Sequence, residues 1–599
     1  MPKPLTMQDL FNRYREILFL DCEYATSSTL RPDPVSAVCH ELKSGRRHDL
    51  WLYNKATEIE NPPWPNDDKT LMVTWYGLAE FSVFHAMGWK LPRVHLDLFT
   101  WWKWFKNGRV MRVNGSSLLD AAMNFNIGTM SSGTKDFWRD LIISRGWTPD
   151  QIEGILNYNT EDVIITTKLF KRVVPYINLK QELNRGEYIK ALSLVEARGI
   201  PIDLQSLREI QESWPALKQV LIDEANKIWP FYKIGSFNFK EFKTYLAHNK
   251  IAWKRTASGR PSTDDDYLKA RGIALPEIEQ LRQVRKTLSK GGKKLLLPVG
   301  SDARNRFMMS PFGQIGGRNN PSTTANVFGN AKWFRQLIQP SPGMALAYID
   351  WTSQEYGVQA FLSQDPVMMR AYDTSCPYLF FGKKIHRIPE NATKLSHPRE
   401  RSILKRVSLA LGYGQGSKSL AHELNIIHAE AQSLIRHHKR TFRVFWEWMD
   451  DTVSKAMLLK KMVARCGWQF HVRCSDRNEY GQREPVNQRT LMNWSCQANA
   501  SEMMRLATIL STREGIKICG IVHDAFLIED RISDIEATVA KTQECMEKAS
   551  RIVLRGHALR SDAQVFRYPE RFPESSGLET WDIFQRFLSD NPQPSLPLP

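Results

Sequence analysis

The chain has 599 residues, of which 42% are hydrophobic and 24% are charged, as in a water-soluble protein of several domains. Lys and Arg outnumber Asp and Glu by 82 to 64, which favours a polyanionic partner, although some equally basic proteins never bind nucleic acid. The lack of a long apolar run, of a signal-peptide core and of any Cys-x-x-Cys among the eight cysteines excludes a membrane-spanning, secreted or zinc-bound protein and predicts a cytoplasmic one.

The first predicted element is a strand over residues 17–23, an apolar run that delivers Asp21 and Glu23. Side chains alternate along a strand, so both carboxylates project from the same face and can share a metal ion. A second strand is predicted over residues 71–75, followed by a helix that carries Glu80 near its start. An Asp-x-Glu after an apolar strand is common, so this pair alone is weak evidence.

In a later helix, Tyr158 and Asp162 are one turn apart and share a face. A hydrogen-bonded helix face would explain this pair alone. Together with Asp21 and Glu23, however, it resembles the DnaQ-like 3′–5′ exonuclease domain. The resemblance implies two metal ions, bound through Asp-x-Glu, a central acid and Tyr-x-x-x-Asp, that activate a water. Glu80 stands where that family shows Asp, which bears on the activity rather than on the fold.

The middle of the chain is helical and basic. Residues 101–105 are mostly aromatic and are expected to pack in a core, and residues 182–198 predict a long helix that ends at Gly199. A basic run follows in residues 279–294. Such runs are usually solvated helix faces, but the cations of this one could instead hold the phosphates of a duplex. Its candidate DNA-binding residues are Arg285, Lys286, Lys290 and Lys293.

Residues 344–349 predict a buried strand that places Asp350 at its carboxyl end, where a hard cation would find an oxygen ligand on a rigid element. The spacing of Thr352 and Glu355 predicts a helix capping box directly after it. By themselves, Asp350 could merely end a strand and Glu355 could merely cap a helix. In the preceding loop, Arg318 is a candidate to reach base edges or a phosphate.

A helix predicted around residues 401–413 carries four residues at a spacing of four, which places them on one broad face. The face presents two cations, an aliphatic side chain and an aromatic ring, in that order. This order suits the phosphates, sugar and base of a nucleoside triphosphate. An amphipathic helix with basic side chains at its edge is the alternative. The four residues are Arg401, Lys405, Leu409 and Tyr413.

Two further stretches complete the pattern. Arg489, Asn493 and Gln497 again recur every four residues, a line of donors that suits hydrogen bonding to a primer or a minor groove. Residues 516–529 predict two apolar strands interrupted by His523-Asp524, so that Asp524 lies at a hairpin turn. A carboxylate there could share metal ions with Asp350.

Three segments, in this order and spacing, identify the chain as resembling the family A DNA polymerases. Asp350-Trp-Thr-Ser-Gln-Glu355 is similar to motif A of that family. The Arg401-x-x-x-Lys405-x-x-x-Leu409-x-x-x-Tyr413-Gly414 pattern is similar to motif B, and Val522-His523-Asp524 to motif C. Two positions depart from the family: Leu409 replaces an aromatic residue, and Ala525 replaces a glutamate.

The resemblance implies a template-directed DNA polymerase with a proofreading exonuclease, acting on primer–template DNA and dNTPs, as a monomer, in phage DNA replication. It implies two Mg²⁺ ions at Asp350 and Asp524, and two more, or Mn²⁺, at Asp21, Glu23 and Asp162. Arg401 and Lys405 would hold phosphates, Tyr413 would back the templating pair, and Glu355 would exclude a ribose 2′-hydroxyl. The implied DNA contacts are Arg318, Arg489, Asn493, Gln497 and His523. A DNA-binding scaffold without synthesis and a nuclease alone are the alternatives.

The expected fold is an α/β multidomain protein, with an RNase H-like exonuclease domain followed by a right-hand polymerase whose palm holds an antiparallel sheet and whose fingers are helical. The expected divisions are an exonuclease domain (1–180), a thumb (181–305), a palm in two parts (306–375 and 481–586), fingers (376–480) and a disordered Pro-rich tail (587–599).

Overall fold

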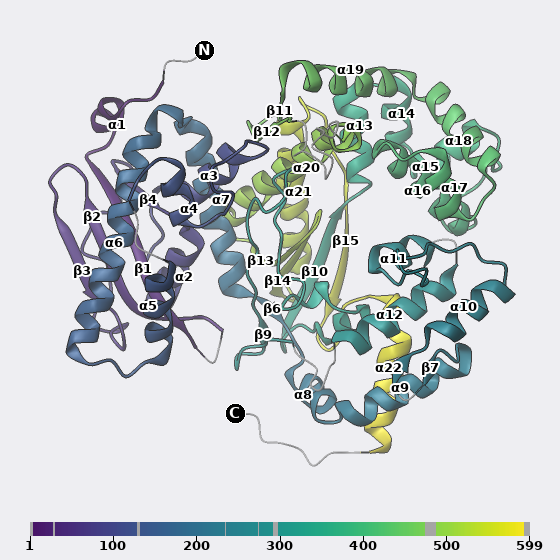
Figure 1. The fold of residues 1–599 in the computed structure, drawn as a ribbon, viewed down its shortest axis with the longest axis horizontal. Helices are drawn as coiled ribbons and strands as arrows, with labels where there is room; N and C mark the ends of the chain where they lie inside the picture. Colours follow the sequence, from purple (N-terminus) through teal and green to yellow (C-terminus); the bar gives the residue numbers. More distant parts are fainter. Residues whose placement is uncertain are drawn as a thin grey trace.

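In the computed structural model, one lobe at the left of Figure 1 precedes a larger body built around a central sheet, with helical groups above and below its right side. The structure describes residues 4–27, 30–128, 132–233, 235–272, 275–290, 297–473 and 487–591. Among these residues, no helix combines the length and the apolar character needed to cross a bilayer.

The amino-terminal lobe is a mixed five-stranded sheet in the order β3-β2-β1-β4-β5. β1 is antiparallel to β2 and parallel to β4, which confirms the strands predicted near residues 17–23 and 71–75. The aromatic run on α3 is core, since Trp101 and Trp102 are fully buried. The strands are β1 (Glu16–Thr26), β2 (Pro32–Glu41), β3 (Arg47–Trp51), β4 (Thr70–Thr74) and β5 (Val94–Asp97), and the helices are α1 (Met7–Arg13), α2 (Gly77–Met87), α3 (Leu98–Lys106), α4 (Leu118–Asn124), α5 (Ser132–Ser144) and α6 (Pro149–Val173).

Helix α7 (Leu179–Arg198) joins the lobe to the larger body. It packs against β5 and α2 of the lobe, and against α20 (Gln488–Arg513) and β13 (Lys517–Val522) of the larger body. It ends at Gly199, whose φ of +69° stops the helix, as the sequence predicted. The approach to β5 is close: a methyl group on Gly186 would lie 2.0 Å from the His95 carbonyl oxygen.

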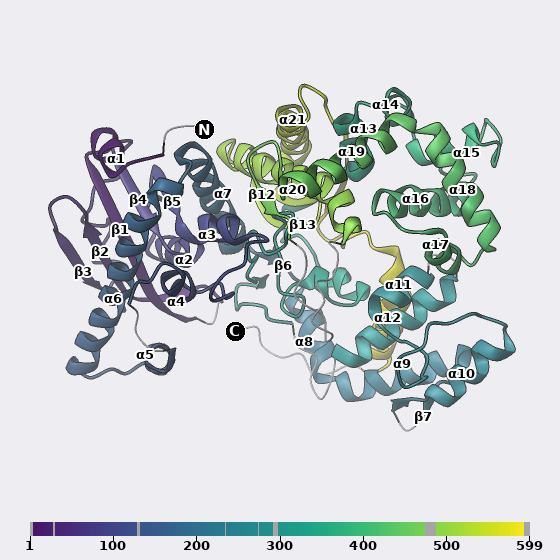
Figure 2. The ribbon, with the colours of Figure 1, turned by 45° about the horizontal axis from the view of Figure 1, so that its top comes forward.

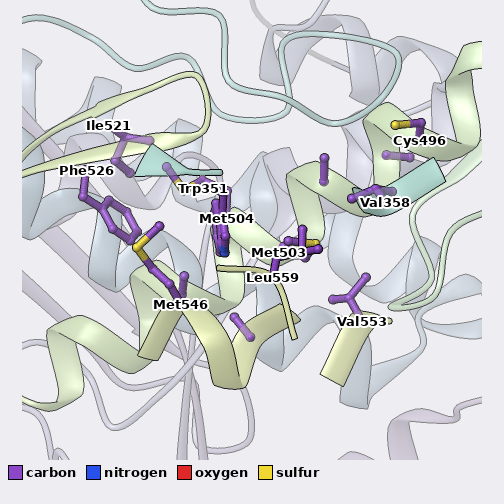
Figure 3. Packing of buried hydrophobic residues seen from close by; sticks show 14 of the residues in the cluster. Trp351, Val358, Cys496, Met503, Met504, Ile521, Phe526, Met546, Val553 and Leu559 are labelled. Carbon is purple, nitrogen blue, oxygen red and sulfur yellow. The ribbon is translucent and has the colours of Figure 1, made fainter. Parts of the chain in front are cut away.

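The larger body is organised around a four-stranded sheet in the order β13-β14-β10-β15, and each neighbouring pair is antiparallel. The predicted antiparallel sheet is therefore confirmed. The sheet packs against α20 and α21, and Met504 and Met546 belong to the same hydrophobic cluster as Phe526 and Ile521 (Figure 3). The elements are β10 (Met344–Trp351), β13 (Lys517–Val522), β14 (Ala525–Arg531), β15 (Ser561–Arg567), α20 (Gln488–Arg513) and α21 (Ile535–Val553).

Two helical groups flank this sheet, and Figure 2 shows that their tips approach each other where α11 meets α17. There the Arg271 side chain donates to the His422 carbonyl. The first group is α8 (Leu204–Glu212), α9 (Trp214–Ile228), α10 (Phe239–His248), α11 (Asp265–Gly272), α12 (Pro276–Lys290) and α22 (Leu578–Asp590); the second is α13 (Gln354–Ser363), α14 (Pro366–Asp373), α15 (Pro377–Lys384), α16 (Pro398–Gly412), α17 (Ser417–Leu424), α18 (His428–Thr441) and α19 (Arg443–Leu459). Short pairs complete the chain: β6 (Ile200–Pro201) with β9 (Arg304–Asn305), β7 (Tyr232–Lys233) with β8 (Ser236–Phe237), and β11 (Lys461–Val463) with β12 (Gln469–His471).

The structure corrects two expectations. The capping box does not form, because Ser353, not Thr352, precedes α13, with φ of +53° and no side-chain cap. Thr352 instead donates from Oγ1 to Asp562 Oδ2 at 2.9 Å, which leaves Glu355 free for other contacts. The disordered tail does not begin at 587, because α22 continues to Asp590; the expected tail over 592–599 lies outside the described residues.

The close approach of α7 to β5 generates a prediction. Gly186→Ala would push a methyl group into the His95 carbonyl, so we expect a loss of about 1–3 kcal/mol of stability from overpacking. Gly133→Ala is the matched control, since a methyl group there meets nothing within 4 Å. Denaturant unfolding of both variants measures the difference, and equal stability of the two would contradict the close packing of α7.

Candidate functional site

The end of the central sheet brings two carboxylates together. Asp350, the second-last residue of β10, is in register with Ala525 at the start of β14. Asp524 immediately precedes Ala525, in the turn where His523 adopts φ of +56°. The amide of Trp351 donates to the Asp524 carbonyl at 3.4 Å. The predicted pair of carboxylates therefore lies at one edge of the sheet, and Asp350 Oδ1 has no hydrogen-bond partner among the described residues.

Burial and like charge make this pair costly to ionise. Burial, reinforced by the charge of Asp524, raises the pKa of Asp350 to about 7, and the Lys405 cation opposes that rise. Burial also raises the pKa of Asp524, although Arg318 opposes the shift. A cation bound between the two groups would remove their repulsion, and carboxylate oxygens are ligands that a hard divalent ion prefers.

Glu355 lies beside this pair and links three elements. Its Oε1 accepts the Tyr413 hydroxyl at 2.8 Å and the Arg318 guanidinium at 3.4 Å. Burial and this carboxylate together raise the pKa of Tyr413 to about 12, so the phenol stays protonated as a donor. Gln497 donates from Nε2 to the same hydroxyl at 3.4 Å. The structure thus places Glu355 in a hydrogen-bonded cluster with Tyr413 instead of at a helix cap.

Helix α16 carries the face that was predicted to present two cations and an aliphatic side chain, followed by the Tyr413 ring. Lys405 is exposed, while Arg401 and Leu409 are half-buried. Tyr413 is the cap residue that follows the helix, and its amide bonds back to Leu409 and Ala410. Because Lys405 influences Asp350 directly, this face and the carboxylate pair belong to one site.

The expected DNA-binding residues differ in how far they are exposed to solvent. Asn493 is buried on α20, whereas Arg489 on its first turn and His523 in the hairpin are exposed. A cavity of about 450 Å³ opens beside this site, and Lys286, Arg318 and His523 are among its lining residues.

The basic run of α12 is only partly available to a ligand. Arg285 lies 4.1 Å above the ring of Phe237, and Arg282 pairs with Asp265 and Glu279. The side chain of Lys290, and Lys293 altogether, lie outside the described residues. Of the residues predicted here, Lys286 is the one that the structure places at the cavity.

The amino-terminal lobe holds a second acidic cluster. Carboxylate oxygens of Asp21 and Glu23 on β1 and of Asp162 on α6 all lie within 4.8 Å of one another, so the three predicted ligands come together. Burial raises the pKa of Asp21, with further effects from Glu80, Asp162 and Glu23. Burial and the charge of Asp162 raise the pKa of Glu23 to about 8. Carboxylate oxygens are ligands that a divalent cation prefers. A cation bound here would also offset the repulsion between the carboxylates.

Glu80 and Tyr158 lie at the edge of this cluster. Glu80 is buried and its Oε2 accepts the Cys22 amide at 2.8 Å, so this carboxylate is held against the strand that carries the other acids. Tyr158 is buried on α6, and its ring lies beneath the ammonium of Lys135 on α5. The same ammonium contacts both oxygens of Asp162, at 2.7 and 3.0 Å, which shows that Tyr158 and Asp162 share a face as predicted.

Two charged residues of these sites were not predicted from the sequence. Lys135 sits in a polar helix that carries no metal-site signature. Asp562 on β15 is in register with Asp350 on its other side, and its charge contributes to the raised pKa of Asp350. Only strand pairing across more than 200 residues brings Asp562 there, so no local pattern could have indicated it.

Comparisons with known proteins find similarities in sequence and in fold. The model of the family described as DNA polymerase family A matches residues 236–560, more than half of the chain. DNA polymerase I of Synechocystis sp. is 26% identical over 378 residues, covering 57% of this chain and 36% of that protein. The DNA polymerase of Mycobacterium phage L5 is 22% identical over 415 residues, covering 67% of this chain and 65% of that protein.

A solved structure extends the likeness in fold to nearly the whole chain. The POL domain of Pol1 from M. smegmatis, in complex with DNA primer-template and dNTP, superposes with a TM-score of 0.68 at 16% identity, covering 92% of this chain and 94% of that chain. The first of the curated relatives is much longer, since the chain spans only about a third of its length.

The raised pKa of Asp350 predicts how stability depends on pH. Between the ordinary value near 3.9 and about 7 the folded state holds the extra proton, so stability falls as the pH rises through that window and stays lowered above it. Without divalent metal at pH 8, we expect Asp350→Asn to stabilise the protein by about 1–3 kcal/mol, and by less at pH 5.

Thermal unfolding at both pH values, with and without Mg²⁺, measures this effect. Mg²⁺ should raise the Tm of the unmutated protein more than that of Asp350→Asn. The control is Asp68→Asn, which neutralises a well exposed carboxylate in the amino-terminal lobe and should change stability little. If Asp350→Asn is less stable than the unmutated protein at pH 8, the repulsion between Asp350 and Asp524 does not destabilise the fold.

Proposed function

The chain belongs to DNA polymerase family A, and from that premise we propose that it is a template-directed DNA polymerase that adds dNTPs to a primer 3′ end. The observation that carries the proposal is the placement of Asp350 and Asp524 at one edge of the antiparallel sheet. The similarity to a phage DNA polymerase supports a role in phage DNA replication.

The carboxylate pair fits the divalent metal ions that family A polymerases use. Asp350 Oδ1 lacks a partner among the described residues, and both groups have a raised pKa that a cation would lower. Two Mg²⁺ ions held by Asp350 and Asp524 would lower the pKa of the primer 3′-hydroxyl and neutralise the triphosphate. The protein's part is to hold these carboxylates rigidly, and strand pairing on both sides of β10 does so.

Helix α16 would bind the incoming nucleotide. Arg401 and Lys405 would hold its phosphates, because they are the two cations on this face of the helix and Lys405 acts on Asp350. Leu409 would meet the sugar and base by dispersion contact, without an aromatic face. Tyr413 would back the templating pair, and Glu355, held by Tyr413 and Arg318, would exclude a ribose 2′-hydroxyl by closeness.

The primer–template would lie in and around the 450 Å³ cavity. Arg318, Lys286 and His523 line it, and Gln497 lies next to Tyr413. Arg489 and Asn493 extend the same line along α20. Arg285 would contact the DNA from its position above the Phe237 ring. Contacts of this kind position a duplex without selecting its sequence.

We further propose that the amino-terminal lobe is a 3′–5′ exonuclease. The cluster of Asp21, Glu23 and Asp162 supports this, as does the mixed sheet on which it is built. The three acids would hold two Mg²⁺ or Mn²⁺ ions for hydrolysis of a primer terminus, with Tyr158 beside the attacked phosphate. Glu80 would serve as the central acid of this site, held in place by the hydrogen bond that it accepts from the Cys22 amide.

Loss of either polymerase carboxylate should abolish synthesis. We expect Asp350→Ala and Asp524→Ala to lower primer extension by at least about a thousand-fold, as expected when electrostatic stabilisation of the transition state is removed, while primer–template binding stays within a few-fold. Asp530→Ala, at the opposite end of β14, is the matched control and should extend normally. Extension by either site variant at a near-normal rate would refute the metal assignment. No extension by the unmutated protein would favour a DNA-binding scaffold or a nuclease.

The exonuclease should be separable from synthesis. Asp21→Ala should remove metal-dependent 3′–5′ degradation of single-stranded DNA and leave primer extension unchanged, because the two acidic clusters lie on different sheets. The control is Asp68→Ala, which removes a well exposed carboxylate of the same lobe and should preserve both activities. If the unmutated protein degrades nothing, the exonuclease proposal fails, and Glu80→Asp tests whether the longer side chain is the reason.

A further inference from the structure

The amino-terminal lobe touches the larger body close to the polymerase site. The carboxyl end of α3 lies against β12 in both views (Figures 1 and 2). From there Trp104 donates to the Gly467 carbonyl at 2.8 Å, and the Arg109 Nε donates to His471 Nε2 at 3.1 Å. Asn107, the cap residue of α3, reaches further than either. Its amide donates to the Gln469 carbonyl at 2.7 Å and to the Ile315 carbonyl at 2.8 Å.

The Ile315 carbonyl is held from three directions. Besides Asn107, the indole N–H groups of Trp468 and Trp494 donate to it, at 2.9 and 3.0 Å. A carbonyl oxygen offers two lone pairs, so these three donors share its full acceptor capacity and hold it from three sides. The donors come from the amino-terminal lobe, from the β11–β12 hairpin and from α20.

The loop that contains this carbonyl has little freedom to move. Residues 314–318 form a tight turn in which the Gly317 amide donates to the Gln314 carbonyl at 2.8 Å. Gly317 has φ of +77°, and a methyl group there would lie 3.0 Å from the Trp468 ring. Arg505 donates to the Gly317 carbonyl at 2.7 Å. A displacement of Ile315 would therefore move the next residues with it.

Arg318 ends this turn and reaches Glu355, whose Oε1 also accepts the Tyr413 hydroxyl. We propose that Asn107 is a positioning residue of the polymerase site. By holding the 314–318 turn, it keeps Arg318 on Glu355 and so sets the selection of deoxyribonucleotides over ribonucleotides. The amino-terminal lobe thereby contributes to nucleotide choice during synthesis. This inference rests on the proposed polymerase function and on the proposed part of Glu355.

The chain supplies a matched control. Trp104→Phe removes the hydrogen bond to Gly467 from the same end of α3 but leaves the donors to Ile315 in place. Asn107→Ala removes the bonds to Ile315 and Gln469. Both variants loosen the contact between the lobe and the hairpin, and only Asn107→Ala disturbs the 314–318 turn. Glu355→Ala calibrates the loss of selection expected when the carboxylate itself is gone.

Single-nucleotide incorporation measures kcat/KM for a dNTP and for the matching rNTP with each variant. We expect Asn107→Ala to lower the ratio of the two by about three- to ten-fold, the effect of losing the hydrogen bond between Arg318 and Glu355. We expect Trp104→Phe to leave the ratio within about a factor of two. The Tm and the degradation of single-stranded DNA by each variant are measured in parallel, since a misfolded lobe would lower both.

The outcomes separate the inference from its premise. An unmutated protein that does not extend primers refutes the polymerase function itself. If Glu355→Ala keeps the normal ratio, Glu355 has no part in selection and the inference falls with it. If Glu355→Ala loses selection but folded Asn107→Ala keeps the normal ratio, or if Trp104→Phe lowers it equally, Asn107 is only a structural contact.

Discussion

The antiparallel pairing of β10 with β14 is the constraint on which the rest of the structure depends. The register that sets Asp350 opposite Ala525 also brings Asp524 to the same edge of the sheet. A slip of one residue would turn Asp350 to the opposite face. The buried face of the sheet prevents such a slip, because α20 and α21 pack against it with Met504, Met546 and their neighbours (Figure 3).

Both acidic sites share one electrostatic design, in which carboxylates are buried close together on rigid strands. Burial and the neighbouring carboxylates raise the pKa of Asp350 and of Glu23, so ionising either group is unfavourable in the absence of a bound cation. The nearby lysines partly offset this cost: Lys405 acts on Asp350, and Lys135 pairs with Asp162. The surrounding cores supply the stability that holds these groups in place.

The two sites are also joined mechanically. Helix α7 is shared by the amino-terminal lobe and the central sheet, and the end of α3 bonds to the hairpin and to the turn that precedes Arg318. Glu355 lies at the end of this chain of contacts, beside Tyr413 and within reach of Arg318. The lobe is thus packed against the larger body as a continuation of it, and not tethered by a linker.

The sequence by itself determined the strands that carry Asp21, Glu23 and Asp350, the helical faces of α6 and α16, and the hairpin at Asp524, because these follow from local periodicity and turn residues. It also determined which carboxylates belong together, through the order of the motifs. Only the tertiary structure decided the partners of Glu355, the position of Asp562 beside Asp350, the cation of Lys135 at Asp162 and the three donors at Ile315. These contacts join residues that are far apart in the chain, and the local pattern around each is compatible with many partners. Thr352 shows the limit most directly: its spacing favoured a capping box, but the neighbouring strand offered Asp562 as a partner for its hydroxyl instead.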